Sequence, residues 1–448
     1  MNMFKTVTIT SNSKIDAKTL LVSQDLIDTI IPNKKEIKLS VGQTSINLQI
    51  KPAQHAKSVN LLSVNKIILK KLYLSDGHSY GIACEPQRIR IGPVVGIMAD
   101  LYGDPNRPFG GQSLFLQQLL TSGRMIGELC FAFSPYGINW DKKQITGYSY
   151  SNKGWQKGLY PFPDVVYPRE RAYSSAKIAI RVKLERSGVK LLNPSLVGKW
   201  QAHKIVSQNP LLQPFLPDTK LVKDFREIDH MINKYKAVYL KPVNGSQGKN
   251  IIKVVKNSGG YKYQYQFENQ TVKGSASSIT RLRGNLRRIM GNRSYIIQNQ
   301  INLLKSNGNI LDVRILVQKD HMGKWGVTGM ACRIGRPGSI TSNISRGGSG
   351  GKVDTVLRRK FADEQRIKIV ETLNFVALEV AKTLEKSLGP LGELGIDIGI
   401  DEEGQVWFIE ANLRPARLVF TLIGEKETRQ LSVDKPMLYS RYLAKFYN

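Results

Sequence analysis

The sequence predicts an α+β protein with several domains, on three observations. A chain of 448 residues is too long for one compact core, so two or three domains are expected. Residues 1–90 alternate short β-branched runs with polar breaks, a pattern typical of a small antiparallel sheet or barrel. From residue 91 continuous apolar runs alternate with helix-like stretches, which indicates an α/β domain over 91–194 and a further domain over 195–448.

The middle segment opens with a continuous apolar strand at residues 93–98. A helix-like stretch at 113–125 and a second apolar run at 127–133 complete a strand–helix–strand unit. The loop at 104–111 reads Asp-Pro-Asn-Arg-Pro-Phe-Gly-Gly, and it is either a substrate loop or a plain connection. The plain connection is the preferred interpretation, because most loops of this kind only join two elements.

The chain is strongly basic, with 66 Lys and Arg residues against 35 Asp and Glu and a net charge of +31. This excess favours polyanionic partners, including nonspecific binding, without choosing among nucleic acid, acidic polymer, acidic peptide and anionic lipid. The three cysteines form no CxxC pair and are expected to be buried apolar residues in a reducing compartment. Without an apolar leader or a run of about 18 apolar residues, the protein is expected to be cytoplasmic and to have no membrane span.

A predicted hairpin near the C-terminus carries three oxygen-bearing side chains. Two apolar runs flank a turn at residues 402–404, and alternation along the second run places Phe408, Glu410 and Asn412 on one face. Asp397 on the first run can face the same pair. Such a set suits a hard divalent cation that keeps positions open for phosphate oxygens, so Mg²⁺ carrying a nucleotide is the expected occupant. The alternative is a hairpin with a polar tip and no ligand.

A second stretch suits an anion. Residues 239–251 form a short strand that ends at Lys241-Pro242, followed by a loop with Gly245, Ser246 and Gly248. Small residues let backbone N–H groups approach an anion, and the strand lysine supplies a fixed positive charge. The spacing differs from that of a P-loop, and a glycine loop alone is more often an ordinary turn.

A third stretch completes the pattern, with Asp312-Val313-Arg314, then Arg333, then Ser-Asn-Ile-Ser-Arg-Gly-Gly at 342–348. The order of these elements resembles that in the ATP-grasp superfamily, in particular its RimK-like and glutathione-synthetase-like ligases, over residues 196–448. The phrases at 91–97, 198–204, 216–219 and 410–415 resemble the YheC/YheD family of endospore-coat-associated ATP-grasp proteins more closely. The resemblance implies two α+β subdomains that hold ATP, a preceding pre-ATP-grasp domain, and association with the spore coat from the mother-cell cytoplasm.

The same resemblance implies roles for individual residues. Lys199, with Lys204 as the less favoured substitute, and Lys241 would contact phosphates, and the backbone of 297–301 would meet adenine, although Asn299 stands where a Glu is common. The cofactor-binding set is Lys199, Lys241, Gly245, Ser246, Gly248, Gln298, Asn299 and Ile301. Asp397, Glu410 and Asn412 would hold one or two Mg²⁺. The catalytic set is Arg314 and Arg333 at phosphate or acyl-phosphate oxygens, Asn343 in the acceptor pocket, and Arg346 and Arg414 near a substrate carboxylate.

The expected activity is an ADP-forming carboxylate–amine ligase that works through an acyl phosphate. Five arginines make the presumed substrate side basic and predict an acidic peptide or protein substrate: Arg333, Arg336, Arg346, Arg414 and Arg417. Other spore-coat proteins are further candidate partners. The main alternative is a coat protein that binds ATP without ligation, and a nucleic-acid-binding protein is a weaker one. A helix expected at 280–290 presents several arginines, either to a partner anion or to solvent.

Overall fold

The computed structural model describes residues 5–31, 34–53, 60–170, 174–194, 197–243, 250–267, 270–342, 344 and 347–446. The chain divides into two compact units. The first unit comprises Met1–Pro194, Lys319–Lys324 and Val433–Asn448, and the second comprises Ser195–Gln318 and Trp325–Ser432. The division after Pro194 falls where the sequence places the start of the last domain, while the further division at residue 90 stays a prediction. Within the described residues, no helix combines the length and apolar character needed to cross a membrane.

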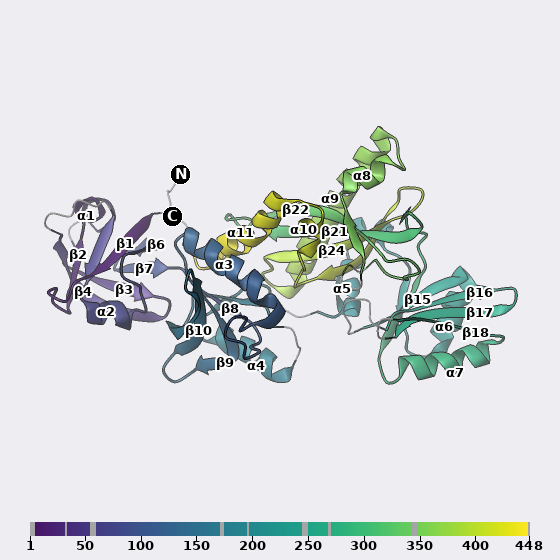
Figure 1. Ribbon diagram of the computed structural model, residues 1–448, viewed down its shortest axis with the longest axis horizontal. Coiled ribbons are helices and arrows are strands. Elements are labelled where there is room, and N and C mark those ends of the chain that lie inside the picture. The colour runs from purple at the N-terminus through teal and green to yellow at the C-terminus, as the bar shows by residue number, and fades with distance from the viewer. Residues whose placement is uncertain are drawn as a thin grey trace. The chain divides into compact units, whose positions relative to one another are not determined.

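The N-terminal part of the first unit is a closed β-barrel (Figure 1). Its strands are β1 (Thr6–Ser11), β2 (Thr19–Val22), β3 (Glu36–Val41), β4 (Thr44–Pro52), β5 (Leu61–Val64), β6 (His78–Glu85) and β7 (Arg88–Gly92), in the order β1-β5-β2-β4-β3-β7-β6. The short helices α1 (Gln24–Ile30) and α2 (Lys66–Lys71) connect them. Three pairs are parallel, namely β1–β5, β2–β4 and β3–β7. The alternating pattern did not predict these pairs, because it identifies a buried face but not the partner strand.

The rest of the first unit is built on a mixed sheet. Its strands are β8 (Val94–Met98), β9 (Leu129–Asn139), β10 (Gln144–Ser151), β11 (Gly154–Pro161), β12 (Val165–Pro168) and β13 (Lys190–Leu191), in the order β11-β10-β9-β8-β12-β13. Strands β9, β8, β12 and β13 run parallel. Helix α3 (Ser113–Met125) packs Leu116 against Val95, whereas α4 (Ser175–Arg186) packs Leu184 against Val94, so the helices cover opposite faces. The predicted helix over 113–125 is confirmed.

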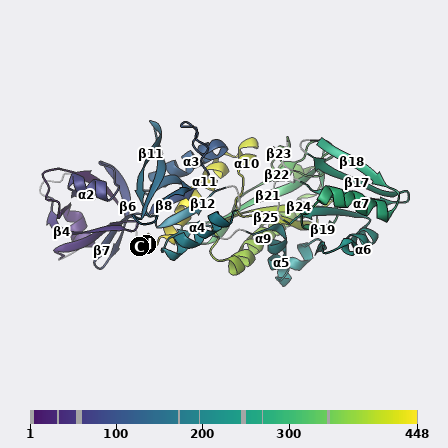
Figure 2. The same ribbon diagram turned by 90° about the horizontal axis from the view of Figure 1, so that it is seen from below.

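The second unit contains two sheets. Its N-terminal sheet consists of β14 (Thr219–Leu221), β15 (Ala237–Pro242), β16 (Ile252–Asn257), β17 (Gly260–Phe267), β18 (Gln270–Ala276) and β19 (Tyr295–Asn299), in the order β14-β19-β15-β16-β17-β18, all antiparallel. Helices α6 (Phe225–Tyr235) and α7 (Ile279–Met290) cover one face, where Met231 and Leu286 pack with Val238 and Val254 (Figure 2). The face of this sheet opposite to α6 and α7 borders the candidate site.

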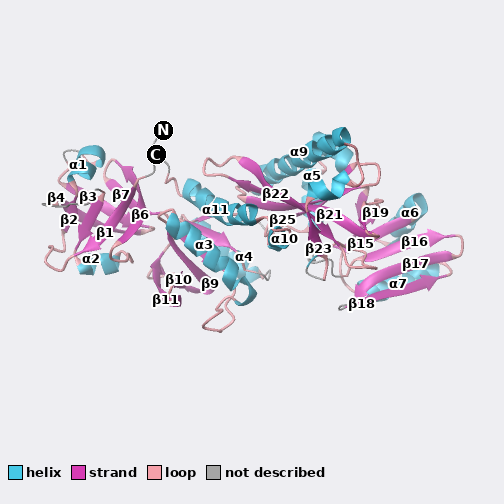
Figure 3. Ribbon diagram, turned by 45° about the horizontal axis from the view of Figure 1, so that its top comes forward, coloured by secondary structure: helices cyan, strands magenta, loops and turns pink. Residues whose placement is uncertain are grey.

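The C-terminal sheet of the second unit has the strand order β23-β22-β21-β24-β25. Its strands are β21 (Asn309–Lys319), β22 (Trp325–Ile334), β23 (Ser349–Gly351), β24 (Glu393–Ile400) and β25 (Val406–Asn412), and β20 (Lys305–Ser306) pairs with β21. Helices α5 (Lys199–Val206) and α9 (Asp363–Leu388) cover one face through a core that includes Val206, Leu373 and Ile396 (Figure 3). The chain is completed by α8 (Val353–Arg358), α10 (Leu418–Leu422) and α11 (Lys426–Leu443). Helix α5 begins at Lys199, and its N-cap residue Gly198 is in an extended conformation.

Candidate active site

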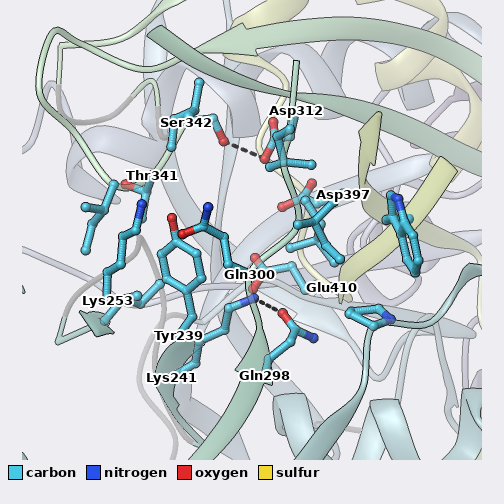
Figure 4. A pocket seen from close by; sticks show the side chains of 18 of the residues that line it. Tyr239, Lys241, Lys253, Gln298, Gln300, Asp312, Thr341, Ser342, Asp397 and Glu410 are labelled. Atoms are coloured by element: carbon cyan, nitrogen blue, oxygen red, sulfur yellow. Dashed lines mark hydrogen bonds between the residues drawn. The ribbon is translucent and has the colours of Figure 1, made fainter. Parts of the chain in front are cut away.

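A cavity of about 170 Å³ lies between the two sheets of the second unit. The face of the N-terminal sheet opposite to α6 and α7 contributes Tyr239, Lys241 and Lys253, and the C-terminal sheet contributes Asp397 and Glu410 (Figure 4). Residues 298–303, which include the end of β19, form a further wall. Ammonium groups from one sheet and carboxylates from the other therefore face the same space.

The predicted metal-binding side chains are placed by the pairing of β24 with β25. Asp397 lies directly opposite Glu410, and Gly395 lies opposite Asn412, so the three polar side chains share one face. The Asn412 amide nitrogen donates to Asp397 Oδ2 and to Glu410 Oε1, each at 3.3 Å. The structure thus brings Asp397, Glu410 and Asn412 together, as the two-strand pattern predicted.

A β-bulge corrects one detail of this hairpin. The register shifts between the Asp397–Glu410 pair and the Ile398–Phe408 pair, which leaves Ile409 as the extra residue on β25. Phe408 consequently packs beside Ile398 in the core under α9, on the face opposite to Glu410. The prediction that Phe408 shares the face of Glu410 and Asn412 is wrong, because strict alternation does not anticipate an inserted residue.

Two lysines bring positive charge to the carboxylates. Lys199 Nζ lies 2.7 Å from Glu410 Oε2, at the first turn of α5. Burial opposes ionisation of Glu410, but the Lys199 ammonium, followed by Arg333 and Lys241, outweighs it and holds the pKa of Glu410 well below its ordinary value. Lys241 donates to Gln298 Oε1 from β15. Burial, reinforced by repulsion from Lys199, lowers the pKa of Lys241 to about 8.

Two of the four predicted catalytic arginines, Arg314 and Arg333, are held by carboxylates. Arg333 Nε donates to Asp312 Oδ1 at 2.7 Å, and its NH2 group lies 2.8 Å from Asp397 Oδ2. Arg314 donates through NH2 to Asp397 Oδ2 at 3.0 Å and through Nε to Oδ1. Burial raises the pKa of Asp397 despite these two arginines. Arg333 lines the cavity. Arg314 is not among the described lining residues, and it contacts Asp397 through its ion pair.

The donor set fits a divalent cation. Asp397, Glu410 and Asn412 offer carboxylate and amide oxygens, the ligand type that Mg²⁺ prefers. Within the described ranges, no group of three or more His, Cys, Asp or Glu side chains is arranged to hold a metal ion. An ion here would therefore take two carboxylates and one amide from the chain, with the Asn412 amide turned so that its oxygen faces the ion. Its remaining positions would be filled by water or phosphate oxygens.

Residues at and after the end of β19 form one wall of the cavity. Gln298 accepts from Lys241 and donates to Thr219 Oγ1 at 2.8 Å, so it fixes the direction of the lysine. Asn299 pairs with Val238, whose side chain lies in the helix-covered core, and so it borders the cavity through its backbone. Gln300, which the sequence did not single out, points into the cavity (Figure 4). Its place two residues after Gln298 on an alternating strand is the signal that could have identified it.

Comparison with known proteins assigns the family. The model of the YheC/D-like ATP-grasp family matches residues 188–443, more than half of the chain. This chain belongs to that family. It is 30% identical over 414 residues to endospore coat-associated protein YheD of Bacillus subtilis (strain 168), covering 90% of each protein. It is 22% identical over 306 residues to endospore coat-associated protein YheC of the same strain, covering 67% of this chain and 84% of that one. The resemblance drawn from the sequence motifs is thereby confirmed.

Solved structures of ATP-grasp proteins are similar at low identity. D-cycloserine synthetase DcsG gives a TM-score of 0.46 at 12% identity and covers 77% of this chain and 99% of its own. VanG D-Ala:D-Ser ligase from Enterococcus faecalis gives a TM-score of 0.45 at 15% identity, with coverage of 78% and 99%. The family model itself, which is that of a YheC/D-like ATP-grasp, assigns the ATP-grasp fold to this chain.

Several predicted site residues of this YheC/D-like protein lie outside the described residues, and their roles stay predictions: Gly245, Ser246, Gly248, Asn343 and Arg346. Among the described ones, Lys199, Lys241, Gln298, Asn299, Ile301, Arg333, Asp397 and Glu410 line the cavity. Arg414 is half-buried in the segment after β25 and is not among the described lining residues. Asp312 and Ser342 also line the cavity, with Ser342 Oγ donating to Asp312 Oδ2 at 2.6 Å (Figure 4).

Two groups of arginines are less available than the sequence suggested. Arg417 is 5% exposed and forms a buried ion pair with Glu393, so the prediction that it adds charge to the substrate side is wrong. On α7, Arg283 forms an ion pair with Asp229 of α6, and Arg287 stacks over the Phe225 ring at 5.1 Å. Much of the basic face expected on this helix is therefore engaged within the second unit.

Proposed function

We propose that this protein is an ATP-dependent, ADP-forming ligase that joins a carboxylate to an amine through an acyl phosphate. The observation that carries the proposal is the placement of Lys199 and Lys241 in one cavity with the opposed carboxylates Asp397 and Glu410, in a chain of an ATP-grasp family. Lysines suit phosphate groups, and the carboxylate pair with Asn412 suits Mg²⁺. No serine or cysteine nucleophile is needed by this chemistry.

ATP bound with Mg²⁺ would supply the γ-phosphoryl group, and the ion would neutralise its developing charge. Asp397 and Glu410 would hold the ion, and Lys241, directed by Gln298, would hold phosphate oxygens. A substrate carboxylate oxygen forms a bond to phosphorus as ADP leaves. An amine then forms a bond to the acyl carbon as inorganic phosphate leaves, and the amine proton passes to solvent. The chain's contribution is alignment and charge neutralisation, with Arg333 nearest to the transferred group.

An acidic peptide or protein is the proposed substrate. The described cavity is lined by four cationic side chains besides Lys241, namely Lys199, Lys253, Lys305 and Arg333. Their charge favours a polyanionic substrate. The two relatives from Bacillus subtilis are named endospore coat-associated proteins, which supports an association with the spore coat. Action from the mother-cell cytoplasm is a further part of the proposal. Coat proteins rich in acidic residues are the corresponding candidate partners.

The test is Mg²⁺-dependent release of ADP by the full chain with pools of amino acids and acidic peptides. Glu410→Gln removes one metal-site carboxylate, and Glu402→Gln, in the exposed turn of the same hairpin, is the matched control. We expect release to require a substrate pool and to be lost in Glu410→Gln but kept in Glu402→Gln. Release of ADP by Glu410→Gln at the level of Glu402→Gln would refute the assignment of the metal site to Glu410. The mass of the product would identify the bond formed.

A non-catalytic, ATP-binding coat protein is the second candidate. It is favoured by the pairing of Lys199 with Glu410, of Arg333 with Asp312 and of Arg314 with Asp397, since these cations already have counter-charges. Tight binding of ATP without turnover in any pool would support this candidate over the ligase.

A further inference from the structure

A group of lysines lies beyond the cavity, on the face of the N-terminal sheet opposite to α6 and α7. Lys253 on β16 pairs with Gln264 on β17, and Gln264 pairs with Lys273 on β18. Residues in register across neighbouring strands point to the same face, and Lys262 shares that face because it lies two residues from Gln264. We call Lys253, Lys262 and Lys273 the lysine strip.

The residues on the other face of the same strands show which way the lysine side chains point. Tyr261, Tyr263 and Tyr265 alternate with Lys262 and Gln264 along β17 and pack against the core under α6 and α7. The lysine strip consequently points away from both helices. Lys262 and Lys273 are exposed, whereas Lys253 is partly buried at the edge of the cavity.

Among the described residues, no carboxylate neutralises the positive charge of the lysine strip. The described parts of β15, β16, β17 and β18 contain no Asp or Glu. None of Lys253, Lys262 and Lys273 forms an ion pair with a described residue. Burial, reinforced by repulsion from Lys305, lowers the pKa of Lys253, which fits a crowd of positive charges. An anionic partner would relieve this repulsion.

The strip is continuous with the candidate active site. Lys253 and Lys305 line the cavity, and Gln264 Nε2 donates to the carbonyl of Gly338 at 3.0 Å. The segment that begins at Gly338 continues to Ile340, Thr341 and Ser342, which also line the cavity. A chain lying along the strip would therefore lead past Lys253 to the carboxylates and lysines of the site.

The spacing and chemistry of the strip suit an extended peptide. Strands are about 4.8 Å apart, so the backbones at Lys253 and Lys273 are separated by roughly 10 Å. This is close to the roughly 9 Å between residues i and i+3 of a polyproline II chain, whose side chains return to the same side every three residues. Gln264 between them can hydrogen-bond to a peptide backbone. The described side chains on this face of β16, β17 and β18 include no aromatic ring, and the ring of Tyr239 on β15 already contacts Lys253, whose Nζ lies 5.8 Å from the ring centroid. Successive nucleobases need several rings for stacking, so this face disfavours single-stranded nucleic acid.

We propose that the lysine strip is a docking surface for an acidic peptide segment of the substrate, which it holds while a carboxylate of that substrate reaches the cavity. This inference rests on the proposed ligase function for the identity of its partner. It assigns the binding of substrate acidic side chains to Lys253, Lys262 and Lys273, outside the metal and phosphate sites.

The test is binding of a fluorescein-labelled oligoglutamate peptide to the full chain, measured by fluorescence anisotropy with Mg²⁺ and ADP present. The double variant Lys262→Gln/Lys273→Gln is compared with Lys66→Gln/Lys70→Gln on α2, which removes the same charge from exposed lysines of the barrel. We expect the strip variant to weaken peptide binding by about tenfold, and the control by less than about twofold, because only the strip would lose direct contacts to carboxylates. ADP binding should be unchanged in both.

Equal weakening in the two double variants would overturn the inference, since it would reduce the strip to general surface charge. Tighter binding of oligothymidylate than of oligoglutamate, with the same dependence on Lys262 and Lys273, would also overturn it in favour of a polynucleotide surface. Failure of the proposed ligase function can be distinguished from failure of the docking surface. Strip-dependent binding of peptide without ADP release in any pool would leave the docking surface standing and refute the ligase.

Discussion

Replacing Arg417 by Met is predicted to destabilise the second unit strongly. Arg417 is 5% exposed and Glu393 is 0% exposed. Their ion pair is supplemented by bonds from Arg417 Nε to the carbonyl of Ser432 and from Arg417 NH1 to the carbonyl of Pro415, both at 3.0 Å. Methionine fills much of the volume but leaves the Glu393 carboxylate buried without its cation. Removing one partner of a buried pair costs about 3–5 kcal/mol, so we expect a loss of that size in the free energy of unfolding.

Urea unfolding followed by circular dichroism measures this loss, and hydrogen exchange of the β24 amides locates it in the second unit. The control is Arg358→Met, because Arg358 and Asp354 form an exposed pair at 2.7 Å that should contribute less than about 1 kcal/mol. The double variant Arg417→Met/Glu393→Met should recover much of the stability, since it removes both charges together. Gln318 keeps its bond to the carbonyl of Ser432 at 3.0 Å in that variant.

A cost below about 1 kcal/mol for Arg417→Met, with no coupling to Glu393, would refute the reasoning. The ion pair of Arg417 with Glu393 would then not stabilise the fold, and Arg417 would again be a candidate for the basic substrate side.

Three further predictions concern separate parts of the chain. Lys241→Met should weaken ADP binding by about 10- to 100-fold in calorimetric titration, because one charged hydrogen bond to phosphate is lost, and unchanged affinity would place the phosphates elsewhere. Burial raises the pKa of Glu128 to about 8 from 4.5, only partly offset by Arg441, so the native state binds an extra proton. This extra proton stabilises the native state fully below pH 4.5, and the stabilisation is lost as the pH rises to about 8. Glu128→Gln should therefore reduce the fall in the free energy of unfolding between these pH values, and an unchanged pH profile would contradict this reasoning. Gly404 has φ +88°, and a Cβ there would meet Gln365 Nε2 at 2.9 Å, so Gly404→Ala should cost about 1–2 kcal/mol in thermal or urea unfolding, whereas no change would mean that the turn adapts.

Much of the site could be predicted from local pattern because its parts are local. The alternation of β25 and the turn at 402–404 were enough to bring Asp397, Glu410 and Asn412 together. The position of Phe408 could not be predicted, because a one-residue bulge reverses every side chain beyond it. The burial of Arg417 depends on Glu393, which lies on β24 and is 24 residues away in the sequence, and the charge of an isolated arginine does not reveal such a partner. The parallel pairs of the barrel escaped prediction for the same reason, since pairing is a long-range property.

The contact between Lys199 and Glu410, at 2.7 Å, has a consequence for how the cavity fills. Under the proposed function, a divalent cation that binds at Glu410 would replace the Lys199 ammonium, so a monovalent cation would be exchanged for a divalent one. The carboxylate would keep a counter-ion throughout, and Lys199, at the first turn of α5, would become available to an incoming phosphate. Binding of the metal and binding of the nucleotide would then be linked through this one side chain, each favouring the other.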